Sequence, residues 1–119
     1  MKRILVVDDS LVVARHYEML FSGSDEFCVA GHAKNGAEAL KLFMEAQPDI
    51  VCMDMTMPEM DGITALRSLM KIDPEARVVM VTSLGGVGEK FNEAIRLGAR
   101  GVISKPFDTE QVLQVLRSL

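Results

Sequence analysis

Short apolar runs alternate with amphipathic segments five times along this 119-residue chain. Each run is bounded by turn or charged residues and consists mostly of β-branched residues or methionine, which is typical of strands. The five runs occupy residues 4–7, 27–30, 50–53, 78–81 and 102–104. Continuous apolar runs of this kind suit strands that are covered on both faces. The alternation therefore predicts a parallel sheet with helices between its strands.

The segments between the runs carry apolar residues at helical spacing. Three such stripes consist of Ala37, Leu40, Phe43 and Met44, of Phe91, Ala94, Ile95 and Gly98, and of Val112, Val115, Leu116 and Leu119. Turn residues agree, since Asn35-Gly36 precedes the second helix and Asp73-Pro74 ends the third. Gly98 stands where a C-terminal cap belongs. We therefore expect five strand–helix units.

Five parallel strands need right-handed crossovers, and the chain is too short for a closed eight-stranded barrel. We predict an α/β fold with an open, doubly wound sheet in the order 2-1-3-4-5, the flavodoxin-like (βα)5 arrangement. The length fits one domain over residues 1–119. Ligands of such a sheet bind at the carboxyl ends of the strands, beside the switch point between strands 1 and 3.

Charge and hydropathy argue against several classes of partner. The net charge is −4 and Lys and Arg are evenly scattered, so direct binding to nucleic acid is not expected. Met1-Lys2-Arg3 leads straight into a strand-sized apolar run without a signal-peptide core. We therefore predict a cytoplasmic protein that does not insert into a membrane.

Cys28 and Cys52 should be free thiols. The predicted order places one strand between the strands that carry them, so these two strands are about 9–10 Å apart, too far for a disulfide.

Polar side chains follow four of the five runs. Asp8 and Asp9 come after the first run, Asp54 after the third, Thr82 after the fourth and Lys105 after the fifth. The predicted strand order makes these four strands neighbours, so their carboxyl ends meet in one crevice. The second strand is at the edge of the sheet and ends in Gly31-His32-Ala33, where we expect no reactive group.

Three carboxylates in one crevice need a positive partner, because each close pair repels by about 4 kcal/mol at an effective dielectric constant near 20. Lys105 leaves an excess of negative charge, so a hard divalent cation that also binds phosphate oxygens, Mg²⁺, fits best. An aspartate such as Asp54 can act as a nucleophile and form an aspartyl phosphate. The Thr82 hydroxyl and the Lys105 ammonium would then contact the new phosphoryl oxygens and respond to the modification.

The motifs at these strand ends are those of a known family. They are Val6-Val7-Asp8-Asp9-Ser10, Met53-Asp54-Met55-Thr56-Met57-Pro58, Val81-Thr82-Ser83 and Ser104-Lys105-Pro106-Phe107. Across its whole length the chain resembles the response-regulator receiver domains, the CheY-like family. The resemblance implies that Asp54 is the phospho-acceptor and that Asp9, Asp54 and the backbone carbonyl of Thr56 bind Mg²⁺ directly. Asp8 would act largely through water.

The resemblance also implies partners and a switch. A sensor histidine kinase would donate the phosphoryl group, and Lys105 and Thr82 would relay its arrival to the surface of the fourth helix, fifth strand and fifth helix. A cis peptide before Pro106 is implied as well. Many relatives have an aromatic residue in the relay where this chain has Val102, so the change would travel mainly through the glycine-rich loop 83–88.

Several interpretations compete at the level of function. A stand-alone chemotaxis-type regulator, not an enzyme, would dock a downstream protein such as the flagellar motor or another chemotaxis protein. The alternative is a receiver excised from a larger regulator, such as a methylesterase or a transcription factor. A haloacid-dehalogenase-type phosphatase is more distant, because it needs an acidic residue where Thr56 stands, and usually a cap. In a flavin carrier, Asp8 and Asp9 would repel the phosphate.

His16 and His32 are interpreted as surface or boundary histidines.

Overall fold

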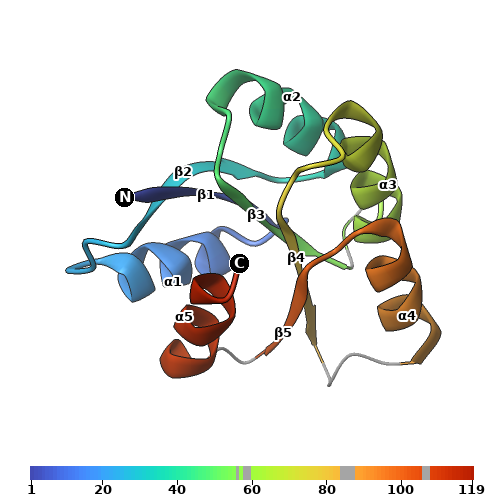
Figure 1. The fold of residues 1–119 in the computed structure, drawn as a ribbon. Helices are drawn as coiled ribbons and strands as arrows, with labels where there is room; N and C mark the ends of the chain where they lie inside the picture. The colour runs from blue at the N-terminus through green and yellow to red at the C-terminus, as the bar shows by residue number, and fades with distance from the viewer. Residues whose placement is uncertain (56, 58–59, 84–87, 106–107) are drawn as a thin grey trace.

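The computed structural model describes the chain except residues 56, 58–59, 84–87 and 106–107, and except the side chains of 83 and 88–91. Strands and helices alternate along the chain as expected (Figure 1). The elements are β1 (Lys2–Val7), α1 (Leu11–Phe21), β2 (Phe27–Ala33), α2 (Gly36–Ala46), β3 (Ile50–Asp54), α3 (Gly62–Ile72), β4 (Val78–Ser83), α4 (Gly88–Leu97), β5 (Gly101–Lys105) and α5 (Thr109–Arg117).

The strands form one parallel sheet in the order β2-β1-β3-β4-β5, which confirms the predicted topology. Every strand is longer than its apolar run, because the ladder of backbone hydrogen bonds extends beyond the apolar residues at one end of the run or at both. The largest extension is in β2, which runs to Ala33 where the apolar run ended at residue 30. The register between β1 and β2 shifts once, since Ile4 pairs with Val29 but Leu5 pairs with Gly31.

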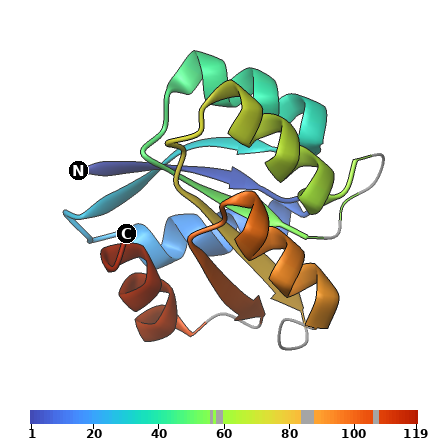
Figure 2. The same cartoon turned by 45° about the vertical axis from the view of Figure 1, so that its right-hand side comes forward.

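Helices cover both faces of the sheet (Figures 1 and 2). Helices α1 and α5 lie on one face, where Ile4 and Val6 of β1 join the core. Helices α2, α3 and α4 lie on the other, where Leu5 and Val7 join a second core. Because side chains alternate along a strand, β1 supplies both cores and is itself buried between them.

The predicted stripe on α5 is confirmed, but the stripes on α2 and α4 are partly wrong. Val112 and Leu116 of α5 are fully buried. On α2 the buried positions include Gly36 and Ala39, whereas Ala37 and Met44 are exposed. Ile95 of α4 is also exposed. Helix α2 buries the small residues Gly36 and Ala39, which lets the helix approach its neighbours closely and leaves the longer side chains at the margin.

The helix ends follow the turn chemistry of the sequence. The side chains of Ser10, Asn35, Asp61 and Asp108 each accept a backbone N–H as N-caps. Gly98 has φ +114°, the left-handed conformation expected of a residue that ends a helix. Among the residues that the structure describes, no helix has both the length and the apolar character that crossing a bilayer requires.

The two cysteines lie in different strands, as predicted. Cys52 is buried in β3 and Cys28 is half-buried in β2, with β1 between the two strands. Both thiols are free, which confirms the prediction. They therefore act as small hydrophobic side chains of the core and its margin.

Candidate functional site

Asp8 follows β1 directly and is the most buried acidic side chain of the site, with 2% exposure. Each of its carboxylate oxygens has a donor: Oδ1 accepts the Ser10 backbone N–H at 2.9 Å, and Oδ2 lies 3.0 Å from the Lys105 ammonium. The Asp8 backbone N–H in turn donates to the Ala33 carbonyl at the end of β2. A buried carboxylate with these partners is held in one orientation.

Asp54 is the last residue of β3 and is also buried, with 6% exposure. Its Oδ2 lies 3.7 Å from the Lys105 ammonium. The backbone behind it is packed against Gly62, the first residue of α3, where an added Cβ would lie 2.1 Å from the Asp54 carbonyl oxygen. Helix α3 therefore begins in direct contact with the strand end that presents this carboxylate.

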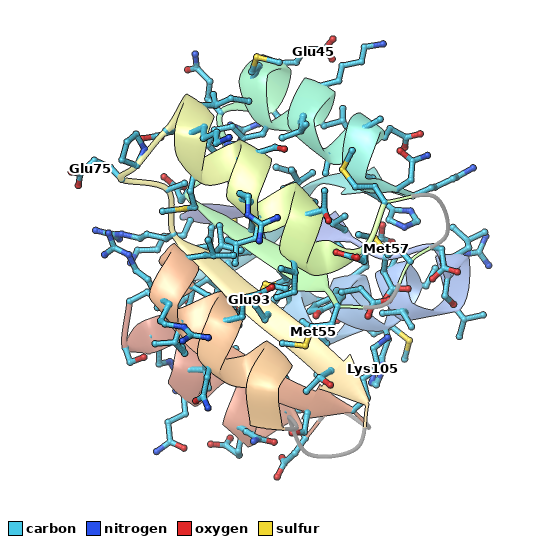
Figure 3. All side chains as sticks on the ribbon, turned by 90° about the vertical axis from the view of Figure 1, so that its right-hand side faces the viewer. Glu45, Met55, Met57, Glu75, Glu93 and Lys105 are labelled. Carbon is cyan, nitrogen blue, oxygen red and sulfur yellow. The ribbon has the colours of Figure 1, made fainter. Side chains whose placement is uncertain are left out.

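Lys105 links these two carboxylates. It ends β5 and pairs in register with Ser83 of β4, so the fifth strand reaches the same edge as the others. Figure 3 shows Lys105 at the end of the sheet to which the strand arrows point, whereas Glu75 lies at the opposite end. An ammonium that contacts both Asp8 and Asp54 offsets part of their repulsion but cannot neutralise two carboxylates.

Asp9 completes a group of three carboxylates. One oxygen each of Asp8, Asp9 and Asp54 lies within 4.8 Å of the others, and Asp9 is exposed while the other two are buried. Opposite ligands of an octahedral Mg²⁺ are about 4.2 Å apart, so small side-chain movements would bring this set to Mg²⁺ geometry. The donors are all hard oxygens and Asp9 is exposed to solvent, which also fits an ion that keeps several waters.

Of the two predicted threonines of the site, the structure describes Thr82 but not Thr56. Thr82 is buried near the end of β4 and pairs in register with Ser104, next to Lys105, as expected from its position after the fourth run. Thr56 lies outside the described residues, as do Pro106 and residues 84–87 of the proposed relay loop. Val102 is half-buried and packs against the core under α2, α3 and α4. An aliphatic side chain therefore packs at this position of the proposed relay.

A tyrosine and a thiol lie in the core near the acidic group. Tyr17 of α1 is buried, and its burial raises the pKa of the phenol well above its usual range, with Cys52, Asp8 and Asp54 adding to the effect. Burial raises the pKa of the Cys52 thiol to about 12. Both groups are therefore neutral at physiological pH, and neither adds charge to the site.

His32 contacts the acidic loop, although the sequence predicted only a surface or boundary histidine. Its Nε2 lies 2.7 Å from the carbonyl oxygen of Asp8, so the edge strand does reach the acidic loop. A polar residue two positions past an apolar run only weakly indicates a site residue. The sequence contains no other feature that would predict the contact between His32 and Asp8. His16, by contrast, is exposed on α1.

Comparison with known proteins identifies the family. The family model described as "Response regulator receiver domain" matches residues 4–117. This chain belongs to the response-regulator receiver family. A receiver is the signalling domain of a two-component response regulator, and phosphorylation of an aspartate with Mg²⁺ is general to the family.

Individual relatives agree with this assignment. The chain is 42% identical over 116 residues to the chemotaxis protein CheY of Listeria monocytogenes, covering 98% of this receiver and 96% of the relative. It is 40% identical over 118 residues to CheY of Thermotoga maritima, covering 99% and 97%. These relatives leave the phosphatase and flavin-carrier alternatives without support.

Solved structures show the same fold. CheY in the CheX-CheY-BeF3-Mg²⁺ complex of Borrelia burgdorferi is 36% identical, with a TM-score of 0.91 over 98% of this receiver and 87% of that chain. The response regulator domain of Thermotoga maritima CheB is 34% identical, with a TM-score of 0.87 over 98% and 95%. Receivers of both kinds, from CheY and from CheB, therefore superpose on nearly the whole chain.

Proposed function

We propose that Asp54 accepts a phosphoryl group from a phosphohistidine of a sensor histidine kinase, and that the modified receiver docks a downstream protein. The observation that carries this proposal is the Lys105 ammonium, which contacts the carboxylates of both Asp8 and Asp54 in the crevice where Asp9 completes the acidic group. Residues 1–119 would form the receiver domain.

The Asp54 carboxylate would be the nucleophile. One of its oxygens forms the new P–O bond as the P–N bond of phosphohistidine breaks, and the histidine nitrogen keeps the electron pair and takes up a proton. An ionised carboxylate has no proton to lose, so the step needs alignment and charge neutralisation rather than a general base. Asp8, Asp9, Asp54 and the carbonyl of Thr56 would hold Mg²⁺, which neutralises charge on the transferring oxygens.

Lys105 would change partners when the phosphoryl group arrives. Before transfer, its ammonium lies between two carboxylates. After transfer, the phosphoryl oxygens on Asp54 carry more negative charge and compete for that ammonium, while the Thr82 hydroxyl donates to another of these oxygens. Because Thr82 lies near the end of β4 and Lys105 ends β5, their movement is the expected link between the site and the surface formed by α4, β5 and α5.

The partners follow from the chemistry and from the relatives. A receiver that is similar to several CheY proteins over nearly its whole length would act in chemotaxis, with the flagellar motor or another chemotaxis protein as its target. A receiver excised from a larger regulator is the second candidate, favoured by the likeness to the CheB domain. Its place would be the cytoplasm, where it would meet a kinase charged from ATP. Contact with nucleic acid or membrane is not part of this function.

Labelling by a small phosphodonor tests the proposal. Wild-type protein incubated with acetyl phosphate and Mg²⁺ should gain the mass of one phosphoryl group, and omission of Mg²⁺ should prevent this. Asp54→Ala should abolish labelling, while Asp25→Ala, which removes an aspartate outside the acidic group, should leave it unchanged. Labelling that persists in Asp54→Ala would refute the assignment of the acceptor.

Lys105→Ala separates modification from signalling. The variant should still be labelled at Asp54 but should dock its target poorly, because the ammonium that senses the phosphoryl oxygens is gone. Intact-mass measurement reports labelling, and binding to the target before and after labelling reports the switch. Wild-type docking by the labelled variant would show that Lys105 has no part in the relay.

A further inference from the structure

We infer that His32 is a positioning residue for the acidic loop, because the hydrogen bond from its ring to the Asp8 carbonyl fixes the backbone that presents Asp8 and Asp9 to a divalent cation. The inference rests on the proposed function in one respect, the Mg²⁺ held by these carboxylates.

The contact itself determines which ring nitrogen carries hydrogen. His32 Nε2 lies 2.7 Å from the Asp8 carbonyl oxygen, and a carbonyl oxygen accepts but cannot donate. Nε2 must therefore carry the hydrogen, and the neutral tautomer that is protonated at Nδ1 is excluded. The ring is half-buried, so the hydrogen bond is partly protected from competing water.

The shift in register within β2 makes the contact possible. Val29 pairs with Ile4 but Gly31 pairs with Leu5, so Ala30 is an extra residue in β2. His32 is therefore opposite Val6, whose side chain packs under α1 and α5. Without the extra residue His32 would be opposite Val7, on the other face of the sheet.

The last two residues of β2 hold both ends of Asp8. The Ala33 carbonyl accepts the Asp8 N–H at 3.0 Å, and the His32 ring donates to the Asp8 carbonyl. That carbonyl belongs to the peptide that leads into Asp9, so its orientation determines the direction in which Asp9 leaves the strand. The edge strand therefore sets the backbone of both acidic residues, although it supplies no carboxylate of its own.

Residues that hydrogen-bond to metal ligands contribute measurably to the affinity for the metal. Loss of such a partner typically weakens binding by about 10–100-fold, because the ligand is no longer held in the binding orientation. Here the partner holds the backbone rather than the carboxylate, so we expect the lower end of that range, about tenfold.

Calorimetric titration of the unphosphorylated protein with Mg²⁺ tests the inference directly. His32→Ala should weaken Mg²⁺ binding about tenfold. His32→Gln should restore most of the affinity, since its amide nitrogen can occupy the place of Nε2. His32→Asn carries the same amide on a shorter side chain and should not restore it. His16→Ala, an exposed histidine of α1, is the control. NMR of the ring nitrogens should show hydrogen on His32 Nε2.

A merely structural role predicts a different result. In that case His32→Ala would lower the melting temperature without Mg²⁺ but bind Mg²⁺ with wild-type affinity, and the inference would be overturned. If His32→Ala does not fold, equal affinities of the Gln and Asn variants would overturn it as well. Calorimetry needs no phosphoryl transfer, so a wild-type protein that binds Mg²⁺ normally but is not labelled would count against the proposed function alone.

Discussion

The two faces of the sheet are packed with different side chains. Under α1 and α5 the core contains the aromatic rings of Tyr17, Phe21 and Phe27, with centroids 6.2 and 5.7 Å apart in successive pairs. Under α2, α3 and α4 the buried side chains include four methionines, Met53, Met55, Met57 and Met80. Rings have few rotamers and pack in defined geometries, whereas methionine is flexible and adapts to irregular space.

The difference matches the tasks of the two faces. Asp8 leads into α1, so the acidic loop is anchored on the aromatic face. Met55 and Met57 come shortly after Asp54 in the sequence, and both side chains pack into the methionine-rich core. The proposed function requires a fixed metal loop and an acceptor segment that can repack when a phosphoryl group is added, and the two cores suit these needs.

The first prediction compares a core residue from each face. Phe21→Ala should lower the free energy of unfolding by about 3–5 kcal/mol, because the rings around it cannot fill the cavity. Met80→Leu should cost less than about 1.5 kcal/mol, because the neighbouring methionines can adjust to a side chain of similar volume. Urea denaturation measures both. Similar losses in the two variants would remove the distinction between the faces.

The second prediction compares two glycines on the methionine-rich face, one packed against a flexible side chain and one packed against backbone. Gly36 and Gly62 are both buried first residues of helices, and an added Cβ would be too close to a neighbour at each. At Gly36 the neighbour is the flexible side chain of Met60, so Gly36→Ala should cost less than about 1 kcal/mol. At Gly62 it is the Asp54 backbone, so Gly62→Ala should cost about 3 kcal/mol and slow labelling of Asp54.

Urea denaturation and phosphodonor labelling of the two alanine variants make this comparison. A Gly62→Ala variant that is as stable and as readily labelled as Gly36→Ala would show that the backbone behind the acceptor can shift freely.

The third prediction tests whether the aromatic face excludes water at high pH. The pKa of Cys52 is raised to about 12 and that of Tyr17 is also raised, both chiefly by burial. Unfolding exposes groups that ionise at lower pH, so the stabilisation is present below the ordinary thiol pKa and is lost as pH rises toward 12. Each group contributes a slope of up to about 1.4 kcal/mol per pH unit.

Urea denaturation at about pH 8, 9 and 10 should show this fall. Cys52→Ala should make it shallower, whereas Cys28→Ala, which removes the half-buried thiol of β2, should leave the slope as it is. A slope that is the same in all three proteins would mean that the Cys52 thiol ionises in the folded protein.

The smallest effect is expected at an ion pair outside both cores. The Arg117 guanidinium contacts both carboxylate oxygens of Glu26, and both side chains are about half exposed. The guanidinium lowers the pKa of Glu26, so the stabilisation is present at neutral pH and is lost as the pH falls through that lowered value. A double-mutant cycle with Glu26→Gln and Arg117→Gln should give a small coupling that shrinks in high salt. A large, salt-independent coupling would contradict this.

Much of the site could be predicted from the sequence because parallel strands end at a common edge. Asp8, Asp54, Thr82 and Lys105 each follow an apolar run, which places them near the carboxyl ends of their strands. The strand order then brings these ends together. The order of the strands in the sheet was predicted from the chain length and from the number of strand–helix units.

Two features could not be predicted, for physical reasons. The rotation of α2 depends on which of several small residues packs against the sheet, and Gly36, Ala37 and Ala39 differ too little to decide it. The extra residue in β2 stands in a stretch without apolar alternation, so no pattern shows that Ala30 shifts the register. The contact of His32 with Asp8 depends on that shift and was missed with it.

The link between Lys105 and Asp8 joins residues 97 positions apart. During synthesis, the three carboxylates leave the ribosome long before the ammonium that holds two of them together. A chain that has not yet formed β5 therefore presents a self-repelling acidic loop, and the site is completed only in the last stage of folding. The response to a phosphoryl group, which depends on Lys105, would thus report that β5 has reached its native place in the sheet.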